Sequence, residues 1–389
     1  MSSFYVTTAI PYVNAAPHLG HALELVQADV LARHARLRGR PARFLTGTDD
    51  NALKNVTAAR AAGVDVRGFV DRNAARYAGR LLEILESGRI RIEPAARRNE
   101  VLAFVRAGLT DLSVSRPAAR AGGWGIPVPG DPGQVIYVWW DALANYVTAL
   151  GYGADDPDYR RWWDGPGERA HVIGKGIVRF HAVHWPALLL SAGLPLPTAV
   201  LVHDYLTVDG AKIAKSGGNT VDPAGLVERY GTDAVRWWLL RDVARLGESD
   251  FTEERLVHRA DTDLANGLGN LVSRTLALPR GEVPEPGELP GWCTELPDRI
   301  DRALRDFDFR AATGAVCAVV DEANRLIEAE RPWKGGGEAV SAVLTGVCRV
   351  LATEVAPFLP DGATRLAERL RRGGRPQPVF PRLGQRARR

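Results

Sequence analysis

Two histidines, His18 and His21, follow the first apolar run of the chain, with Gly20 between them. Imidazole nitrogens can donate hydrogen bonds to phosphate oxygens, and a glycine leaves room for a flat base. The β-branched and aromatic run at 4–10 predicts a strand, and apolar residues at helical spacing predict a helix over 18–38. The N-terminus of a helix that follows a strand attracts phosphate. For these four residues in isolation, two surface histidines on one helical turn are the favoured interpretation.

A second basic pair, Lys212 and Lys215, lies in the run 212–218, which ends in two glycines. The chain has only five lysines against 45 arginines, a ratio that indicates coding bias towards arginine. Two amines in such a loop could close over a polyphosphate and stabilise the charge that develops during transfer. Two exposed lysines in a solvated turn are the alternative. No third ligand accompanies the histidines, which argues against a metal site.

The composition is that of a folded globular protein of two or three domains, with 389 residues, 46% hydrophobic and 25% charged. A net charge of +4 permits an anionic partner without requiring one. The three cysteines lie far apart without a CxxC pair, so we expect neither structural zinc nor disulfides. Prolines interrupt the longest uncharged stretch, and the N-terminus lacks a basic signal-peptide start. We therefore expect a cytoplasmic protein that does not enter a membrane.

Strand and helix patterns alternate through the first half of the chain, which predicts a parallel α/β sheet. Beyond the opening strand and helix, we expect strands at 43–47, 135–140, 171–174 and 198–202, and helices near 52–62, 67–87 and 177–191. The Arg-, Gly- and Pro-rich residues 88–134 are predicted to be a connector. An all-α region follows, with helical patterns at 260–278, 297–331 and 337–372 and a Pro/Gly-rich break at 279–296.

Taken in this order, HLGH at 18–21 and KIAKS at 212–216 resemble the HIGH and KMSKS signatures of class I aminoacyl-tRNA synthetases. Longer runs resemble the methionyl-tRNA synthetase family, at 8–14, 47–50, 138–146, 171–175 and 263–266. The resemblance covers nearly the whole chain. It implies a Rossmann-like parallel sheet followed by an all-α helical bundle.

The resemblance also implies a division into five segments. These are Rossmann-like catalytic halves at 1–87 and 135–205, a vestigial connective segment at 88–134, a KMSKS-loop and stem-contact region at 206–258, and a helical anticodon-binding-like domain at 259–389.

Site residues are implied in the same way. ATP would be bound by His18, Gly20, His21, Lys175, Lys212, Lys215 and Ser216, of which His18, His21, Lys212 and Lys215 would be catalytic. The amino acid would be bound by Ala9, Ile10, Tyr12, Asp49, Trp139, Leu143, Tyr146, Ile177, His181 and Trp185, with Asp49 on the α-ammonium group. A thioether favours a polarizable, aromatic-lined pocket, to which His181 and Tyr146 could supply donors towards sulfur. Alternatively, these aromatics are plain core.

In the helical domain, Asn270, Arg274 and Trp333 fall where the family reads the anticodon. Asn270 and Arg274 lie one turn apart on one helix face, and Arg and aromatic side chains commonly read unstacked RNA bases. The structural alternative for Trp333 is a hydrophobic anchor after the end of a helix.

Several positions depart from the family pattern. The zinc-binding connective insert is essentially absent between the two α/β halves, which bears on transfer to tRNA more than on adenylation. Asp-Glu-His-Gly is replaced by residues 49–52, Asp-Asp-Asn-Ala, and the Asp of Gly-Lys-Asp is Gly176. Ile213 and Ala214 replace the Met and first Ser of KMSKS, whereas both lysines remain.

The leading hypothesis is an ATP-dependent ligase that forms an aminoacyl-adenylate, with methionine as the amino acid and tRNA as the acceptor. ATP would enter with Mg²⁺, and no structural zinc is expected. The first alternative is a tRNA-independent paralogue that activates an amino acid for natural-product biosynthesis of the hydrazine type, with a separate partner protein. The second alternative is a non-catalytic RNA-binding relic, although such a relic would have no reason to keep scarce lysines at both signature positions.

Overall fold

The chain folds into two compact units. The first comprises Met1–Ala16 and His34–His203, and the second comprises Pro17–Arg33 and Asp204–Arg389. The computed structural model describes residues 2–11, 17–47, 80–109, 115–121, 125–154, 156–213, 221–278, 288–334, 337–372 and 378–384. The helix predicted near 52–62, and most of the one predicted at 67–87, lie outside these ranges.

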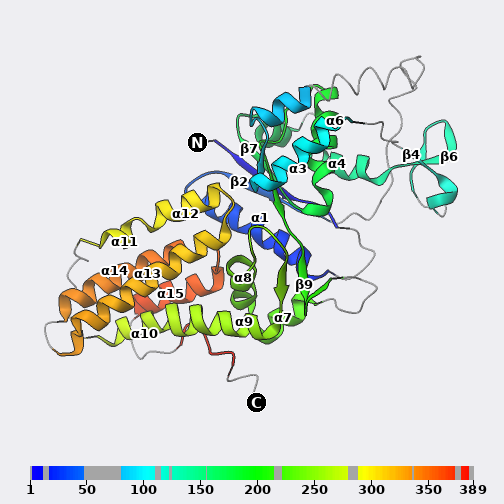
Figure 1. The fold of residues 1–389 in the computed structure, drawn as a ribbon. Coiled ribbons are helices and arrows are strands. Elements are labelled where there is room, and N and C mark those ends of the chain that lie inside the picture. The colour runs from blue at the N-terminus through cyan, green and yellow to red at the C-terminus, as the bar shows by residue number, and fades with distance from the viewer. Residues whose placement is uncertain are drawn as a thin grey trace. The chain divides into compact units, whose positions relative to one another are not determined.

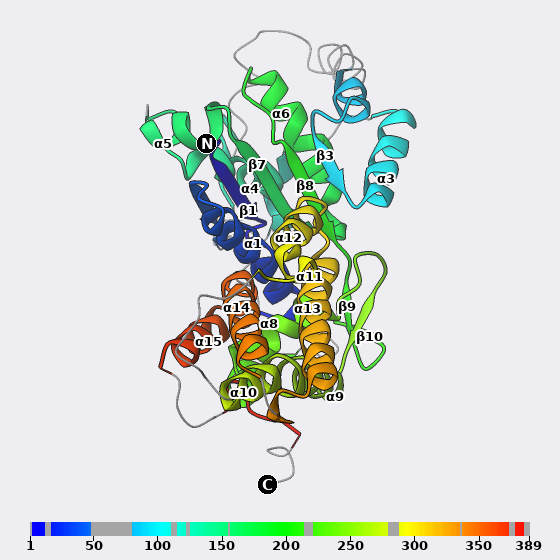
Figure 2. The same ribbon diagram turned by 90° about the vertical axis from the view of Figure 1, so that its left-hand side faces the viewer.

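Five parallel strands form the central sheet of the first unit (Figure 2). Their order is β2 (Ala42–Leu45), β1 (Phe4–Thr8), β7 (Glu168–Gly174), β8 (Ala199–His203) and β3 (Arg91–Glu93). All five residues of β1 are buried, as expected for a β-branched and aromatic strand that is covered on both faces. The strand order reverses between β1 and β7, where Thr8 lies opposite Val172. Open α/β sheets bind ligands beyond the carboxyl ends of strands at such a point.

Helices of the first unit pack against this sheet (Figure 1). Their buried side chains form two apolar clusters with it. One cluster joins residues 80–86 and α3 (Ala95–Arg106) to β3, β7 and β8. The other joins α4 (Val138–Thr148) and α6 (Trp185–Ser191) to Tyr5 of β1 and to two adjacent tryptophans, Trp162 and Trp163. The predicted helix at 177–191 is confirmed, although a π-helical turn, Phe180–His184, precedes α6.

The strand predicted at 135–140 is wrong in its second half. The strand β6 (Asp131–Ile136) ends before Tyr137, and α4 begins at Val138. The three apolar positions Trp139, Leu143 and Tyr146 recur at helical spacing, and their burial against the sheet outweighs the β propensity of a short aromatic run.

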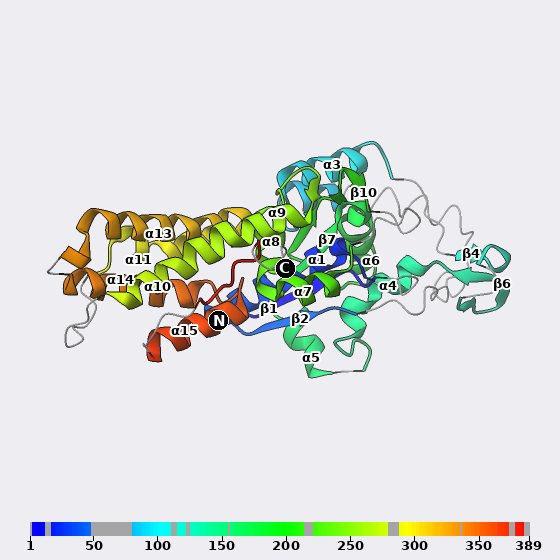
Figure 3. The ribbon, with the colours of Figure 1, turned by 90° about the horizontal axis from the view of Figure 1, so that it is seen from below.

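The prediction that residues 88–134 are only a connector is wrong, because they also supply a strand and a helix to the first unit. Within them, β3 is the edge strand of the central sheet beside β8, and α3 packs in its core. A separate three-stranded sheet follows, formed by β4 (Ser115–Pro117), β5 (Pro127–Val128) and β6 in the order β4-β6-β5 (Figure 3).

The second unit combines a small sheet with a helical bundle. The sheet has the order β10-β9-β11, formed by β9 (Leu206–Val208), β10 (Ala211–Lys212) and β11 (Ser249–Phe251). Its helices are α7 (Pro223–Tyr230), α8 (Thr232–Arg241), α9 (Glu253–Arg259), α10 (Asn270–Ala277), α11 (Gly291–Thr294), α12 (Leu296–Arg305), α13 (Phe309–Glu330), α14 (Glu338–Glu354) and α15 (Pro360–Arg372). The helices α10, α13 and α14 pack together, and Figure 3 shows them side by side.

Two predicted helical stretches, 297–331 and 337–372, are each two helices. Phe307 has a left-handed backbone (φ 54°), and the carboxylate of Asp308 accepts the N–H of Ala311 to cap α13. Pro360, which cannot donate within a helix, begins α15. Within the described residues, no helix has the length and apolar character needed to cross a bilayer.

Candidate active site

Predicted site residues follow the ends of two neighbouring strands of the central sheet. Ala9 and Ile10 come directly after β1, and Lys175 comes directly after β7. Because β1 and β7 are parallel and paired, these residues share the carboxyl edge at which the strand order reverses. This edge is the expected ligand site of an open α/β sheet.

A cluster of aromatic side chains contains most of the predicted amino-acid pocket. Trp139, Leu143 and Tyr146 share one face of α4. His181 lies in the π-helical turn before α6, and Trp185 is the first residue of α6. All except Trp139 are at least 97% buried. The Trp139 ring stacks on Phe180, with centroids 4.0 Å apart, and meets His181 edge-on. The structure therefore brings these five predicted residues together.

The hydrogen bonds of His181 determine its tautomer. Its Nδ1–H donates to the carbonyl of Ile177 (3.0 Å), because a carbonyl can only accept. Burial lowers the pKa of His181 to about 4, so the ring is neutral and Nε2 has no proton. The hydroxyl of Tyr146 therefore donates to Nε2 (2.7 Å). The expectation that His181 and Tyr146 supply donors to a substrate sulfur is not met in this arrangement, because both protons are given to protein acceptors.

Because His181 is protonated less readily in the folded protein than in the unfolded chain, the free energy of unfolding depends on pH. Between pH 6.5 and about 4, the unfolded chain protonates this histidine and the folded protein does not. We expect the free energy of unfolding to fall as pH is lowered through this window, by about 3 kcal/mol from this residue. His181→Gln should remove that part of the slope in chemical denaturation at pH 7 and pH 4. His258→Gln, at an exposed position, should leave it, and equal slopes for all three proteins would contradict the prediction.

The two predicted phosphate-binding histidines lie at the start of α1 (Leu19–Leu37), in the second unit. Their rings are stacked, with centroids 3.8 Å apart. The carbonyl of His18 accepts the N–H of His21 (2.9 Å), and Nδ1 of His21 accepts the N–H of His18 (3.3 Å). When neutral, His21 therefore carries its proton on Nε2. A Cβ on Gly20 would lie 3.1 Å from the ring of His18, so the glycine makes room for that ring.

The first turn of α1 contains no acidic residue, so no side chain there opposes the binding of phosphate. Further along this helix, Asp29 pairs with Arg236 of α8 (2.7 Å). The same guanidinium donates to the carbonyls of Pro357 and Phe358 (both 2.8 Å). These contacts anchor the first part of α1 to the helical bundle.

Lys212 is the last residue of β10, where its backbone pairs with Thr207 of β9. Asp209 and Gly210 both have positive φ, as a two-residue hairpin requires. The carboxylate of Asp250 accepts from the Thr207 hydroxyl and the Gly210 N–H (both 2.7 Å), which lowers the pKa of Asp250. The sequence alone predicts no role for Asp250. The only local signal for the hairpin is its two-residue turn, Asp209 and Gly210.

Four predicted site residues lie outside the described residues: Tyr12, Asp49, Lys215 and Ser216.

The predicted RNA-reading residues lie on α10 and in the short turn that follows α13. Asn270 begins α10 and is exposed, whereas Arg274 donates to Asn324 of α13 (3.1 Å) and pairs with Glu328. Trp333 follows α13 and is 55% exposed, so it does not serve as a hydrophobic anchor. The preceding residue of that turn, Pro332, is the buried one.

The three cysteines are free thiols, and Cys293 and Cys348 are buried. Burial raises the pKa of Cys293 to about 11 and those of Cys317 and Cys348 to about 12, so all three remain thiols at neutral pH. Within the described ranges, no group of three or more His, Cys, Asp or Glu side chains is placed to hold a metal ion.

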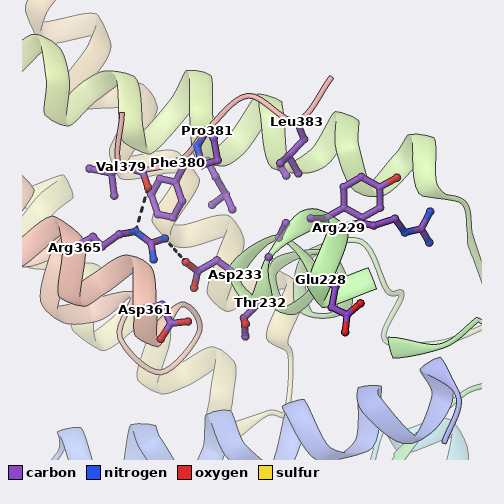
Figure 4. Close-up of a pocket in the computed structure, with 15 residues that line it drawn as sticks. Glu228, Arg229, Thr232, Asp233, Asp361, Arg365, Val379, Phe380, Pro381 and Leu383 are labelled. Carbon is purple, nitrogen blue, oxygen red and sulfur yellow. Dashed lines mark hydrogen bonds and ion pairs between the residues drawn. The ribbon is translucent and has the colours of Figure 1, made fainter. Parts of the chain in front are cut away.

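A cavity of about 420 Å³ lies in the second unit, between α8, α15 and the segment 378–384 (Figure 4). Arg365 donates to the carbonyl of Val379 (3.2 Å) and pairs with Asp233 (2.6 Å). Burial raises the pKa of Asp233, and Arg365 opposes this effect. None of the predicted site residues lines this cavity, so it is not the predicted active site.

Several known proteins similar to this chain are methionine–tRNA ligases or methionyl-tRNA synthetases. The family model "tRNA synthetases class I (M)" matches residues 4–87 and 75–276. A methionine–tRNA ligase of Brucella suis is 36% identical over 508 aligned positions, covering 97% of this chain and 98% of the relative. One from Mycobacterium leprae is 34% identical, covering 95% and 89%. These alignments are longer than the 389 residues of this chain, so the relatives contain segments without a counterpart here.

Solved structures agree with the sequence similarity. A methionyl-tRNA synthetase of Mycobacterium tuberculosis in complex with methionyl-adenylate has a TM-score of 0.80 and 32% identity, covering 95% of this chain and 94% of that chain. The apo form of the synthetase from the same organism has a TM-score of 0.78 and 30% identity, covering 98% of both chains.

Proposed function

Since the chain belongs to the class I tRNA synthetases of the methionyl family, we propose that it activates methionine with ATP and transfers it to tRNA. It is a ligase that forms an aminoacyl-adenylate. The observation that carries the choice of methionine is the aromatic cluster, in which the rings of Trp139, Tyr146, His181 and Trp185 contact one another. These four side chains would line one slot for the methionine side chain. Such a slot is polarizable and suits a thioether.

In the first step, a carboxylate oxygen of methionine attacks the α-phosphorus of Mg-ATP, and the bond to the β-phosphate breaks to release pyrophosphate. No side chain needs to form a covalent intermediate. The Nε2–H of His21 and the N-terminus of α1 would hold phosphate oxygens, with His18 and Gly20 beside them. Catalysis would come from positioning and from stabilisation of developing charge.

The charge that builds on the leaving pyrophosphate would be met by Lys212 and Lys215, with Ser216 and Lys175 as further ATP contacts. The β9–β10 hairpin, held by Asp250, fixes the backbone at Lys212 and so supports this role. Asp49 would hold the substrate ammonium, and Ala9, Ile10, Tyr12, Leu143 and Ile177 would complete the methionine pocket.

In the second step, a ribose hydroxyl of tRNA attacks the carbonyl carbon of the adenylate, and AMP leaves. Asn270, Arg274 and Trp333 would contact the anticodon. The exposed indole of Trp333 and the exposed Asn270 support this assignment, because unstacked bases are read by stacking and by polar side chains. We also propose the five-segment division given above, except that β3 and α3 belong to the catalytic sheet and the reduced connective segment follows α3. We further propose a cytoplasmic location. No separate partner protein is part of the proposal.

Neither alternative is favoured. The relatives that match nearly the whole chain at 34–36% identity are methionine–tRNA ligases, which favours the charging enzyme over a tRNA-independent paralogue or a non-catalytic relic. The features that would favour the paralogue are departures from the family pattern: the short connective segment, Asn51, Ala52 and Gly176.

Exchange of pyrophosphate into ATP, measured across a panel of amino acids with and without tRNA and followed by a charging assay, tests the proposal. We expect exchange with methionine, and methionyl-tRNA as the product. Exchange without charging would support the paralogue. No exchange with any amino acid would overturn both enzymatic assignments.

A further inference from the structure

His171 is a buried histidine of the central strand β7 to which no role has been assigned. Its ring contacts the aromatic cluster at Tyr146 and His181. Its side chain is fully buried. Its Nδ1 is 2.7 Å from the hydroxyl of Thr7 on β1, and its Nε2 is 3.2 Å from Nε1 of Trp185 on α6. The ring therefore links two strands of the sheet to a wall of the proposed pocket.

The chemistry of the partners determines the direction of both bonds. An indole N–H can only donate, so Nε2 of His171 must be an acceptor without a proton. Burial lowers the pKa of His171 well below 6.5, which keeps the ring neutral. Its proton is therefore on Nδ1 and is donated to Thr7. Hydrogen bonds run in one direction, from Trp185 through His171 to Thr7.

His171 also packs on a second wall of the slot. The ring of Tyr146 lies 4.3 Å from that of His171, centroid to centroid. The rings of Tyr146 and Trp185 are 5.9 Å apart, at an interplanar angle of 62°. A single buried side chain thus contacts both rings, and it holds one of them by a hydrogen bond whose loss would leave an indole N–H unpaired in the core.

We propose that His171 is a positioning residue for side-chain selection: by binding Trp185 and packing against Tyr146, it sets the width of the amino-acid slot. The inference rests on the proposed methionine pocket. A histidine that only fills the core would affect stability, or would affect all substrates alike. A positioning residue changes the choice between side chains of different length.

His171→Phe keeps a planar ring and removes the acceptor for Trp185. In pyrophosphate exchange, we expect the ratio of kcat/KM for methionine to that for ethionine, which is one methylene longer, to fall about tenfold. The KM for ATP should stay within about twofold. His171→Gln, which can present an amide oxygen near the position of Nε2, should recover most of the ratio.

A double-mutant cycle separates this role from core packing. In a Trp185→Phe background the indole N–H is absent, so His171→Phe should change the ratio no further. Trp163→Phe is the matched control, because Trp163 lies in the same cluster but donates its N–H to the carbonyl of Pro195 (3.0 Å). In that background, His171→Phe should keep its full effect.

If His171→Phe fails to fold, Thr7→Val tests the same chain of hydrogen bonds, because it removes the acceptor of the His171 Nδ1–H. This variant should also lower the ratio of kcat/KM for methionine to that for ethionine. Equal losses for methionine and ethionine, or a full effect in the Trp185→Phe background, would overturn the inference. Wild-type exchange with methionine is measured first. Its absence would overturn the proposed function, whereas wild-type activity with an unchanged ratio in the variants would overturn only the role of His171.

Discussion

Replacement of Lys215 by alanine is expected to lower the rate of pyrophosphate exchange by about 10²–10³-fold, the usual cost of removing one group that meets transition-state charge. The physical reason is the negative charge that grows on the departing pyrophosphate, for which the amine is the proposed counter-charge. Because this charge develops only during the reaction, the KM for methionine should change little. The measurement is steady-state exchange at saturating methionine, with the melting temperature recorded alongside.

Lys334→Ala is the matched control, because Lys334 is another of the five lysines and lies exposed in the helical bundle. It should leave exchange unchanged in the absence of tRNA. If Lys215→Ala retained wild-type exchange, the assignment of the 212–218 loop to pyrophosphate would be wrong.

The second large effect is expected at His181. His181→Leu removes the acceptor of the Tyr146 hydroxyl and the donor to the Ile177 carbonyl in one step. The tyrosine must then find another partner, and a displacement of about 1 Å in a binding wall can cost about 10²-fold. We expect kcat/KM for methionine to fall by about that factor, with the KM for ATP unchanged.

His184→Leu provides the comparison for this variant. His184 lies in the same π-helical turn and contacts Phe180 (5.5 Å between ring centroids), but it has no proposed contact with the substrate. The same substitution there should leave methionine kinetics within about twofold. A rise in the KM values of methionine and ATP by the same factor in His181→Leu would show that the whole fold had been disturbed and would contradict the prediction.

Much of the fold could be predicted because its signals are local. The strands β1 and β8 come from short, buried runs of mostly apolar and β-branched residues, and the helices of the bundle have strong periodicity. The error at 135–140 has a physical cause. Six residues of aromatic and β-branched character suit either a strand or a helix, and only the packing of Trp139, Leu143 and Tyr146 on one surface selects the helix.

The edge strand β3 is a second element that local sequence signals could not predict. Three residues, Arg91–Glu93, carry almost no pattern of their own, and they become a strand because β8 offers them an unpaired edge. The breaks that divide the two long helical stretches depend on the left-handed backbone at Phe307 and on the start of α15 at Pro360. Of these two signals, only the proline could be recognised in the chain itself.

The sequence by itself determined the family, because HLGH, KIAKS and the runs between them are combinations of residue types that chance does not assemble in that order. It also determined which side chains are available for chemistry. The tertiary structure alone decided how the described pocket residues hold their protons: His181 is neutral and accepts from Tyr146, and His171 accepts from Trp185. The reason is that a tautomer depends on burial and on the partner of each ring nitrogen, and those partners come from segments far apart in the chain.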